Sequence, residues 1–472
     1  MNFLKKIFSS VFLTISLYLL IYTFYKSEIH HNALQRDYYL NYYIISSLLI
    51  ILSIITFFIN QKIKEYLIIS FISVIMCLYV FEGYLTVQEQ ILKKQLSEDQ
   101  LLDAKLLKEL ILKEQIYKTQ TGKNFDKRTK LEVYSDLKKV NNKIKVSVSV
   151  PASGYYILKN YNLLPLAGTS NSETIHCNEN GYYSIYQSDR YGFNNPDSEW
   201  DNEEVEYFLI GDSYTHGACL NRPNDIASIL RVLSDKTVLN LGYSGNSSLI
   251  EYATLREYFK PNIKKVLWIY YENDLEELNN ELKNKILKNY LNDLTFTQNL
   301  KLKQNEIDIL ANKAIEIAKE REINIKIKEE QKARTKESFK YNFFKFIKIY
   351  NLRSSIISKP RPQMNEQTQT LPFQKFKKIL KLTKNLTDKN KSTLYFVYLP
   401  SYSRYKTKYN NSNYLSIKKI LKELDIPIVD IHEEVFNKNK NPLKFFPFGL
   451  YGHYTVDGYK KVAETIYKFT KD

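Results

Sequence analysis

The sequence predicts an α/β domain with a parallel sheet, joined to three N-terminal membrane helices, on three observations. Three long apolar stretches open the chain. Short, near-continuous apolar segments then alternate with helical ones in the C-terminal half, as in a parallel sheet covered on both faces. Glycine is scarce, with 13 in 472 residues, yet seven lie in three short segments beside these elements, where the backbone must turn tightly or approach a ligand. These seven are Gly211, Gly217, Gly242, Gly245, Gly449, Gly452 and Gly458.

The three apolar stretches are about Ile7–Tyr25, Tyr38–Ile59 and Tyr66–Leu85. About 20 apolar residues at 1.5 Å each cross a ~30 Å hydrocarbon core, so each stretch is long enough to span a bilayer. The first has no small-residue cleavage site, and two further stretches follow it. We therefore expect three retained helices rather than a signal peptide.

The basic residues beside these helices indicate the orientation of the chain. Lys5 and Lys6 precede the first helix, and Lys62 and Lys64 lie in the second loop, which favours a cytoplasmic start. Lys26 and Arg36 are in the first loop and weaken this bias. Three crossings from a cytoplasmic start predict an integral protein of the bacterial inner membrane, in contact with the lipid bilayer, whose C-terminal domain is periplasmic.

Charge and cysteine content restrict the partners. The formal charge is +17, but the lysines are spread through helical stretches without an Arg-rich stripe or a nucleic-acid motif, so no nucleic-acid partner is expected. No Cys/His cluster predicts a metal site, and no cofactor is expected. Of three cysteines, Cys77 lies in an apolar stretch. Cys177 and Cys219 could form a disulfide in an oxidising compartment or remain two buried thiols.

Four segments are predicted along the chain. Residues 1–87 form the anchor, and 88–150 form an amphipathic helical stalk in which leucines recur at helical spacing. Residues 151–204 are a turn-rich, aromatic lead-in, with Asn-Glu-Asn-Gly at 178–181. Residues 205–472 form the α/β domain. It contains a helical insertion at about 275–385, which is too long for one crossover and is expected to be a packing or lid element.

Five strands and a final helix are predicted in the α/β domain. They are Glu206–Ile210, Thr237–Leu241, Lys265–Tyr271, Thr393–Leu399, Pro427–Ile431 and a helix at about Thr455–Phe469. Ligands of open parallel sheets bind at the carboxyl ends of the strands. Ser213, Gly242 and Asn273 follow the first three strands, and His453 precedes the last helix. All four can therefore converge on one edge.

These four residues match the requirements of acyl transfer. That reaction needs a hydroxyl nucleophile, a base to take its proton, and donors aimed at the developing oxyanion. Ser213 supplies the nucleophile and His453 the base. The backbone N–H groups of Ser213 and Gly242, with the Asn273 amide, supply the oxyanion hole. The alternatives are a turn serine that caps the next helix and a turn-forming asparagine.

In this order, Gly-Asp-Ser at 211–213, the glycine loop at Gly242, Asn273-Asp274 and the late His453 resemble the SGNH/GDSL hydrolase superfamily. The resemblance covers about 205–275 and 390–470. It implies a flavodoxin-like three-layer α/β/α sandwich with a parallel five-stranded sheet. It also implies ester hydrolysis or, in some members, acyl transfer to sugars. The lead-in from Asn178 to Asn195 is similar to that of membrane-tethered members.

One position departs from the family pattern. The family places an aspartate three residues before the histidine, and Leu450 stands there in this chain. Three interpretations stay open. The pair could work as a dyad with a backbone carbonyl, a carboxylate could come from elsewhere, with Asp430 as the candidate, or the enzyme could be weak or inactive. In serine enzymes, loss of the orienting carboxylate can lower turnover by ~10⁴.

The expected function is therefore a membrane-anchored serine esterase that cleaves an O-acyl, most plausibly O-acetyl, ester through an acyl-serine intermediate. The expected substrate is a small ester or an acylated envelope or exported glycan. An O-acyltransferase that uses the same site is one alternative. A catalytically inactive glycan-binding or assembly protein is another. The oligomeric state is not indicated by the sequence.

Overall fold

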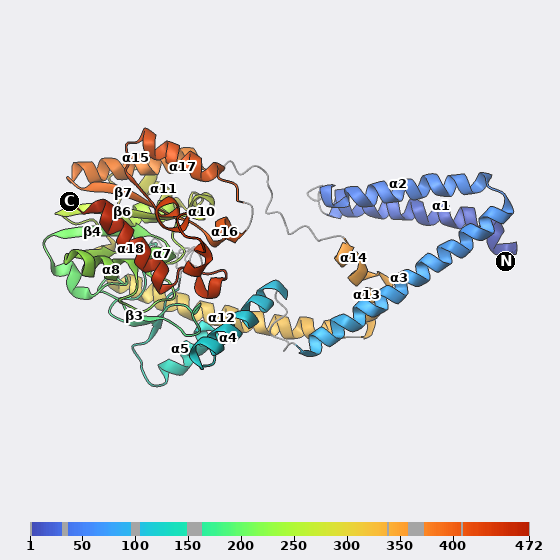
Figure 1. Cartoon of the computed structure of the whole chain (residues 1–472), viewed down its shortest axis with the longest axis horizontal. Helices are drawn as coiled ribbons and strands as arrows, with labels where there is room; N and C mark the ends of the chain where they lie inside the picture. Colours follow the sequence, from blue (N-terminus) through green and yellow to red (C-terminus); the bar gives the residue numbers. More distant parts are fainter. Residues whose placement is uncertain are drawn as a thin grey trace. The chain divides into compact units, whose positions relative to one another are not determined.

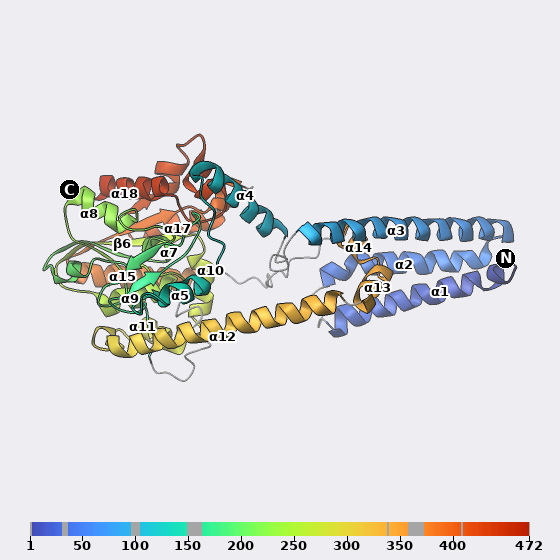
Figure 2. The same ribbon diagram turned by 90° about the horizontal axis from the view of Figure 1, so that it is seen from below.

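The computed structural model describes residues 2–30, 36–95, 104–148, 163–337, 339–356, 372–406 and 409–471. The chain divides into two compact units. The anchor unit comprises Met1–Leu102 and Ile327–Gln367, and the α/β unit comprises Asp103–Lys326 and Thr368–Asp472. Figure 1 and Figure 2 show the two units in two views.

A five-stranded, all-parallel sheet forms the centre of the α/β unit, as predicted. Its strands are β4 (Val205–Gly211), β5 (Val238–Asn240), β6 (Ile263–Tyr271), β7 (Thr393–Leu399) and β8 (Ile428–Asp430). Their order, β5-β4-β6-β7-β8, places the first strand between the second and third, which is the flavodoxin-like arrangement. The predicted α/β fold is confirmed, and each predicted strand end lies within two residues of the observed one.

Helices cover both faces of this sheet and complete a three-layer sandwich. Alternate side chains of a strand point to opposite faces, so Tyr207 and Leu209 of β4 enter one core cluster, and Phe208 and Ile210 the other. Figure 2 shows the sheet between these helical layers. The first face is covered by α8 (Ile226–Ser234) and α18 (Val456–Thr470), and the second by α9 (Ser248–Tyr258), α15 (Phe373–Lys389) and α17 (Ser412–Glu423).

A small second sheet precedes the sandwich and was not predicted. Its strands are β1 (Lys145–Val146), β2 (Glu173–Ile175) and β3 (Ile185–Gln187), and β2 and β3 form an antiparallel hairpin. Strands of two or three residues leave almost no periodicity in a sequence. The hairpin is followed by Asn195, whose side-chain amide donates to the β5 carbonyl oxygen of Asn240 at 2.8 Å. The lead-in is therefore fastened to the main sheet.

The predicted stalk helix is divided between the two units. Helix α3 (Gln61–Gln95) continues from the third membrane stretch, and α4 (Ala104–Thr121) begins a new helix in the α/β unit. Two of the leucines that recur at helical spacing in the predicted stalk, Leu96 and Leu102, lie outside the described residues. Helix α4 is followed by α5 (Lys130–Lys138), whose N-cap Thr129 forms a capping box with Glu132.

The anchor unit contains the three predicted membrane helices. They are α1 (Asn2–Phe24) with its continuation η1 (Tyr25–His30), α2 (Arg36–Phe58) and the first part of α3. Within the described residues, three segments are long and apolar enough to cross a membrane: Ile7–His30, Tyr39–Phe58 and Gln61–Gln88. Most of their apolar side chains are exposed in the protein, as lipid contact requires.

The insertion between β6 and β7 is divided between the units as well. It comprises α10 (Asp274–Glu281), α11 (Lys285–Asn292), η4 (Leu300–Leu302), α12 (Gln304–Glu337), α13 (Phe339–Ile347) and α14 (Tyr350–Ile356). Helices α10 and α11 contact α9 in the α/β unit, whereas α13 and α14 contact α3 in the anchor unit. Helical periodicity predicted these helices but did not reveal which unit each one packs in.

Short helices fill the remaining connections of the α/β unit. They are η3 (Asp197–Asp201), α7 (Ser213–His216), α16 (Tyr402–Lys406), η5 (His432–Phe436), η6 (Pro442–Phe445) and η7 (Pro447–Gly449). The last helix, α18, begins after the N-cap Thr455, whose side chain accepts a hydrogen bond from the Gly458 N–H. This cap fixes the position of the residues just before it, including His453.

Candidate active site

Ser213 is the first residue of α7, directly beyond the carboxyl end of β4. The preceding residue, Asp212, caps this helix, and its carboxylate accepts a 2.9 Å hydrogen bond from the Tyr214 N–H. The backbone N–H groups of a first helical turn have no acceptor within the helix. Strand, cap and short helix together place the Ser213 hydroxyl and its backbone N–H at the edge of the sheet.

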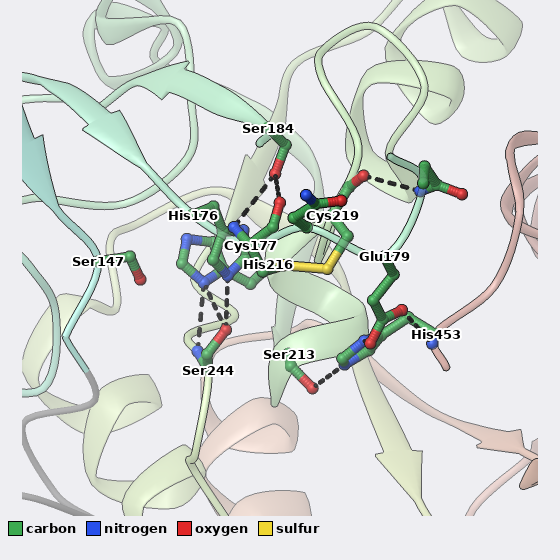
Figure 3. The surroundings of a disulfide bond; sticks show 12 residues. Ser147, His176, Cys177, Glu179, Ser184, Ser213, His216, Cys219, Ser244 and His453 are labelled. Atoms are coloured by element: carbon green, nitrogen blue, oxygen red, sulfur yellow. Dashed lines mark hydrogen bonds and ion pairs between the residues drawn. A yellow bond between two sulfur atoms is a disulfide. The ribbon is translucent and has the colours of Figure 1, made fainter. Parts of the chain in front are cut away.

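His453 reaches this serine from the other end of the domain sequence. Its Nε2 lies 2.8 Å from the Ser213 Oγ, although the two residues are 240 positions apart (Figure 3). Two contacts from α4 hold the neighbouring residue Tyr451. Glu109 accepts its N–H at 2.9 Å, and Lys113 donates to its carbonyl at 2.7 Å. The structure thus brings the predicted nucleophile and base within hydrogen-bond distance.

Glu179 occupies the other side of the imidazole. Its Oε1 lies 2.9 Å from His453 Nδ1, and its Oε2 accepts the His453 backbone N–H at 2.6 Å (Figure 3). One carboxylate therefore fixes both the ring and the backbone of this histidine. Gly452 permits the approach, because a Cβ at that position would lie 2.8 Å from Glu179 Oε2. Ser213, His453 and Glu179 have the arrangement of a serine-enzyme triad.

The expectation that Asp430 orients the histidine is wrong. Asp430 lies at the end of β8, where its Oδ2 accepts hydrogen bonds from the Tyr414 hydroxyl at 2.6 Å and the Lys418 Nζ at 3.2 Å. Both partners come from α17. The Asp430 carboxylate therefore joins α17 to the sheet, and the carboxylate beside His453 is that of Glu179.

The loop that carries Glu179 is held at both ends. It is the connection between β2 and β3, and the Cys177–Cys219 disulfide bonds it to the segment that follows α7. The side-chain amide of Asn180 donates to the Cys219 carbonyl at 3.0 Å, and that of Asn178 donates to the Asp126 carbonyl at 2.8 Å. Of the two possibilities that the sequence left open for Cys177 and Cys219, the structure has the disulfide, which links the carboxylate loop to the nucleophile's loop, as Figure 3 shows.

His453 and Glu179 shift each other's pKa values. Burial lowers the pKa of His453, but the Glu179 carboxylate and, further away, Asp212 raise it by more, so the pKa lies above its usual 6.5. Burial raises the pKa of Glu179, but the His453 ring and its hydrogen bonds lower it by more, so this pKa lies below 4.5. Glu179 is therefore ionised at neutral pH and stabilises a protonated His453.

The predicted oxyanion donors differ in what they now bind. The Gly242 N–H donates to Asn240 Oδ1 at 2.9 Å, so its single hydrogen already has an acceptor. The Asn273 amide donates to Glu277 Oε1 at 3.1 Å, which leaves its second amide hydrogen for another acceptor. The next residue after Gly242 pairs with β4, since the Tyr243 N–H donates to the Gly211 carbonyl at 3.2 Å. The Gly242 loop therefore lies beside the nucleophile's turn.

Two buried histidines support the loop after Gly242. The Ser244 hydroxyl lies 2.8 Å from His176 Nε2 and 3.1 Å from His216 Nδ1 (Figure 3). The two rings are tilted against each other with centroids 4.1 Å apart. Burial lowers the pKa of His216 to about 3, and burial likewise lowers that of His176. Both rings are therefore neutral and act as packing and hydrogen-bonding groups.

Among the described residues, Glu179, Cys219 and His453 form one group that could hold a metal ion, with ligand atoms within 4.8 Å of one another. The Cys219 sulfur is bonded to Cys177, however, and zinc takes a thiolate rather than a disulfide sulfur. Glu179 and His453 are also engaged with each other. The residues therefore do not fit a metal in the disulfide-bonded form.

Glu179 was absent from the predicted site, although two features of the sequence pointed to it. The turn at 178–181 and the cysteine at 177 were both recognised, and a bridge from Cys177 to Cys219 brings residue 179 near the nucleophile's turn. Neither feature identifies which polar residue of the loop faces the histidine. That depends on the hairpin formed by β2 and β3.

Comparison with protein-family models finds no match, and comparison with curated proteins finds none either. The chain is similar to a solved structure described as a "putative lipolytic protein of G-D-S-L family" from Desulfitobacterium hafniense DCB-2. The two share 12% sequence identity, over 56% of this chain and 99% of that chain, with a TM-score of 0.28. A likeness at this level does not identify a function.

Proposed function

We propose that the protein is a membrane-anchored serine esterase of SGNH type, with Ser213 as nucleophile, His453 as general base and acid, and Glu179 as the group that orients the histidine. One observation carries the proposal. A continuous line of hydrogen bonds runs from Ser213 Oγ to His453 Nε2 at 2.8 Å and from His453 Nδ1 to Glu179 at 2.9 Å. Nucleophile, base and orienting acid are each within the distance that their role requires.

In the first half-reaction, Ser213 Oγ attacks the carbonyl carbon of the ester while its proton moves to His453 Nε2. Glu179 stabilises the imidazolium that forms, in keeping with the raised pKa of His453. The tetrahedral adduct then collapses. Its bond to the alcohol oxygen breaks, the alcohol takes the proton from Nε2, and an acyl-serine remains.

The second half-reaction releases the acyl group. A water molecule gives its proton to His453 Nε2 and attacks the acyl carbon, and the proton then returns to Ser213 Oγ as the carboxylic acid leaves. Entry of a sugar hydroxyl in place of water would make the same site an O-acyltransferase. Hydrolysis is the proposed reaction, because the reaction with water needs no second binding site.

The negative oxygen of each tetrahedral adduct requires donors at the strand ends. The Ser213 N–H in the first turn of α7 and the second amide hydrogen of Asn273 are the proposed pair. The Gly242 N–H would join them only by leaving Asn240, to which it is bonded now. Each such donor contributes a factor of roughly 10²–10³ to turnover.

The proposed substrate is an O-acetyl ester on an envelope or exported glycan. Two features support an extracytoplasmic active site. The described part of the chain has three helices able to cross a membrane, and a disulfide, which is formed and kept in oxidising compartments, lies beside the triad. A periplasmic unit at the inner membrane encounters acylated glycans. The proposed location is therefore the bacterial inner membrane, with the α/β unit in the periplasm.

A fluorophosphonate probe tests the proposal, because it bonds covalently to an activated serine. We expect the detergent-solubilised full chain to be labelled, and labelling to disappear in Ser213→Ala but remain in Ser416→Ala. Ser416 is a half-buried serine of α17 whose hydroxyl donates to the Ser412 carbonyl in its own helix. No labelling of the folded protein would favour the inactive glycan-binding or assembly protein instead. A labelled protein that acetylates a glycan faster than it hydrolyses acetyl esters would favour the transferase.

A further inference from the structure

Helices α13 and α14 pack against the third membrane helix, although they come from the insertion between two strands of the α/β unit. The Tyr79 hydroxyl of α3 donates to the Ile347 carbonyl at 2.9 Å, and its ring lies 5.5 Å from the ring of Phe346. The Phe346 ring also lies against Gly83, at 3.9 Å from the position of a Cβ there. These contacts show that helices α13 and α14 belong to the anchor unit.

A buried carboxylate strengthens the attachment. Glu82 lies inside the apolar segment Gln61–Gln88 and is 0% exposed. Its two oxygens accept the backbone N–H groups of Asn351 at 3.0 Å and Leu352 at 2.8 Å, both in the first turn of α14. A charged group in a membrane helix requires such partners. Separation of α14 from α3 would leave this carboxylate without them.

The depth of this contact follows from helix length. The segment Gln61–Gln88 has 28 residues, which is about 42 Å at 1.5 Å per residue, whereas the hydrocarbon core is ~30 Å thick. Helices α13 and α14 contact it between Tyr79 and Thr86, in its last third. Because the segment is longer than the hydrocarbon core, its last third extends from the core to the boundary with the headgroups.

The outward side of α13 has the composition of such a boundary. Phe344 and Ile347 are 49% and 44% exposed, and on α3 the nearby Val80 is 72% exposed. Lys348 and Arg353 are exposed in the same segment. An apolar face with basic residues beside it fits the surface of a bilayer, where apolar side chains enter the acyl boundary and basic groups meet phosphates.

We propose that α13 and α14 form a lipid-contacting element at the headgroup boundary of the bilayer, on the side where α3 ends. The chain therefore returns to the membrane between β6 and β7. Along the chain, the α/β unit is joined to the anchor unit at three points: before α4, through α12, and between α14 and α15. This proposal stands apart from the esterase chemistry, since it rests only on contacts within the anchor unit.

Depth measurements on the full chain test the proposal. An environment-sensitive nitrobenzoxadiazole probe is attached at Phe344→Cys in a Cys77→Ser background, without reductant, so that the Cys177–Cys219 disulfide stays closed. The matched control is Val232→Cys, at a residue of α8 that is 77% exposed. In nanodiscs of phosphatidylcholine and phosphatidylglycerol, we expect the probe at 344 to show blue-shifted emission, quenching by lipids spin-labelled near the headgroup, and loss of quenching by iodide. The control should show the reverse.

Two results would overturn the proposal. Equal iodide quenching at 344 and 232 would place α13 in water. A blue shift without quenching by the labelled lipids would assign the face to a second copy of the chain.

The variant Glu82→Leu, which removes the acceptor for α14, should reduce quenching by the labelled lipids, while Glu82→Gln, which keeps an acceptor oxygen, should preserve it. Unchanged quenching in Glu82→Leu would contradict the role of the carboxylate in this attachment.

Discussion

The strand-end loops of the sandwich and the β2–β3 hairpin of the lead-in supply the candidate site in different ways. Ser213 and His453 are placed by the sandwich, through the end of β4 and the cap of α18. Glu179 is placed by a hairpin of three-residue strands, fastened to the site by a disulfide. The sandwich obtains its precision from a buried core on both faces. The hairpin has little core of its own, and the Cys177–Cys219 disulfide holds it in position instead.

The largest expected effect concerns the sandwich side of this comparison. Replacement of the base, His453→Ala, should lower kcat for a chromogenic acetyl ester by ~10⁶, because nucleophile and base act as one unit. The matched variant His432→Ala should leave kcat unchanged, since that ring lies at the end of β8 beside the Tyr405 hydroxyl, at 2.7 Å. Equal losses in the two variants would show that His453 has no special role.

The next effect concerns the oxyanion hole. We expect Asn273→Ala to lower kcat by roughly 10²–10³ with little change in KM, because the donor acts mainly on the tetrahedral adduct. Asn273→Asp keeps the shape of the side chain but has no hydrogen-bond donor when it is ionised, so kcat should fall by the same factor. Wild-type turnover in both variants would leave the Ser213 N–H as the donor and return Asn273 to a turn-forming role.

Opening of the disulfide tests the hairpin side directly. The paired variant Cys177→Ser/Cys219→Ser should lower kcat by up to ~10², the cost expected when a catalytic group is displaced by about 1 Å. The bridge closes a loop with a sequence separation of 42. Its loss should also lower the free energy of unfolding by about 2–4 kcal/mol. Cys77→Ser, in the membrane helix, is the control. Full activity of the paired variant would mean that noncovalent contacts alone hold Glu179.

The smallest effect is a shift in the pH profile. Catalysis requires neutral His453, whose pKa is raised by Glu179, so activity should fall as the pH drops through a value above 6.5. Glu179→Gln removes the negative charge and lowers this pKa, so the residual activity should persist to lower pH. An acid limb that stays in place in Glu179→Gln would show that another group sets it.

The sequence predicted the sandwich well because its strands are buried on both faces. Continuous apolar runs such as Lys265–Tyr271 leave little choice of structure, and the polar residues that end them must lie at one edge. Ser213 and Asn273 could be selected on that basis, whereas His453 precedes the last helix and was selected as the base that a serine nucleophile requires.

Glu179 could not be selected in this way. The hairpin strands are too short to show a period. Leu450 occupies the position where the family has its aspartate, three residues before the histidine, so Asp430 was the candidate carboxylate. The carboxylate instead approaches from the lead-in, where Gly452 leaves it room. The packing of α13 against α3 was missed for a related reason, since an amphipathic pattern marks a buried face but does not identify its partner.

The most direct test of the central claim compares two carboxylates in one assay. Turnover of a chromogenic acetyl ester is measured for Glu179→Gln and Asp430→Asn, with the Cys177–Cys219 disulfide verified by mass spectrometry in both. We expect Glu179→Gln to lower kcat by ~10⁴, as when a triad loses its orienting carboxylate, and Asp430→Asn to leave kcat unchanged. Full turnover in Glu179→Gln, or a comparable loss in Asp430→Asn, would contradict the central claim.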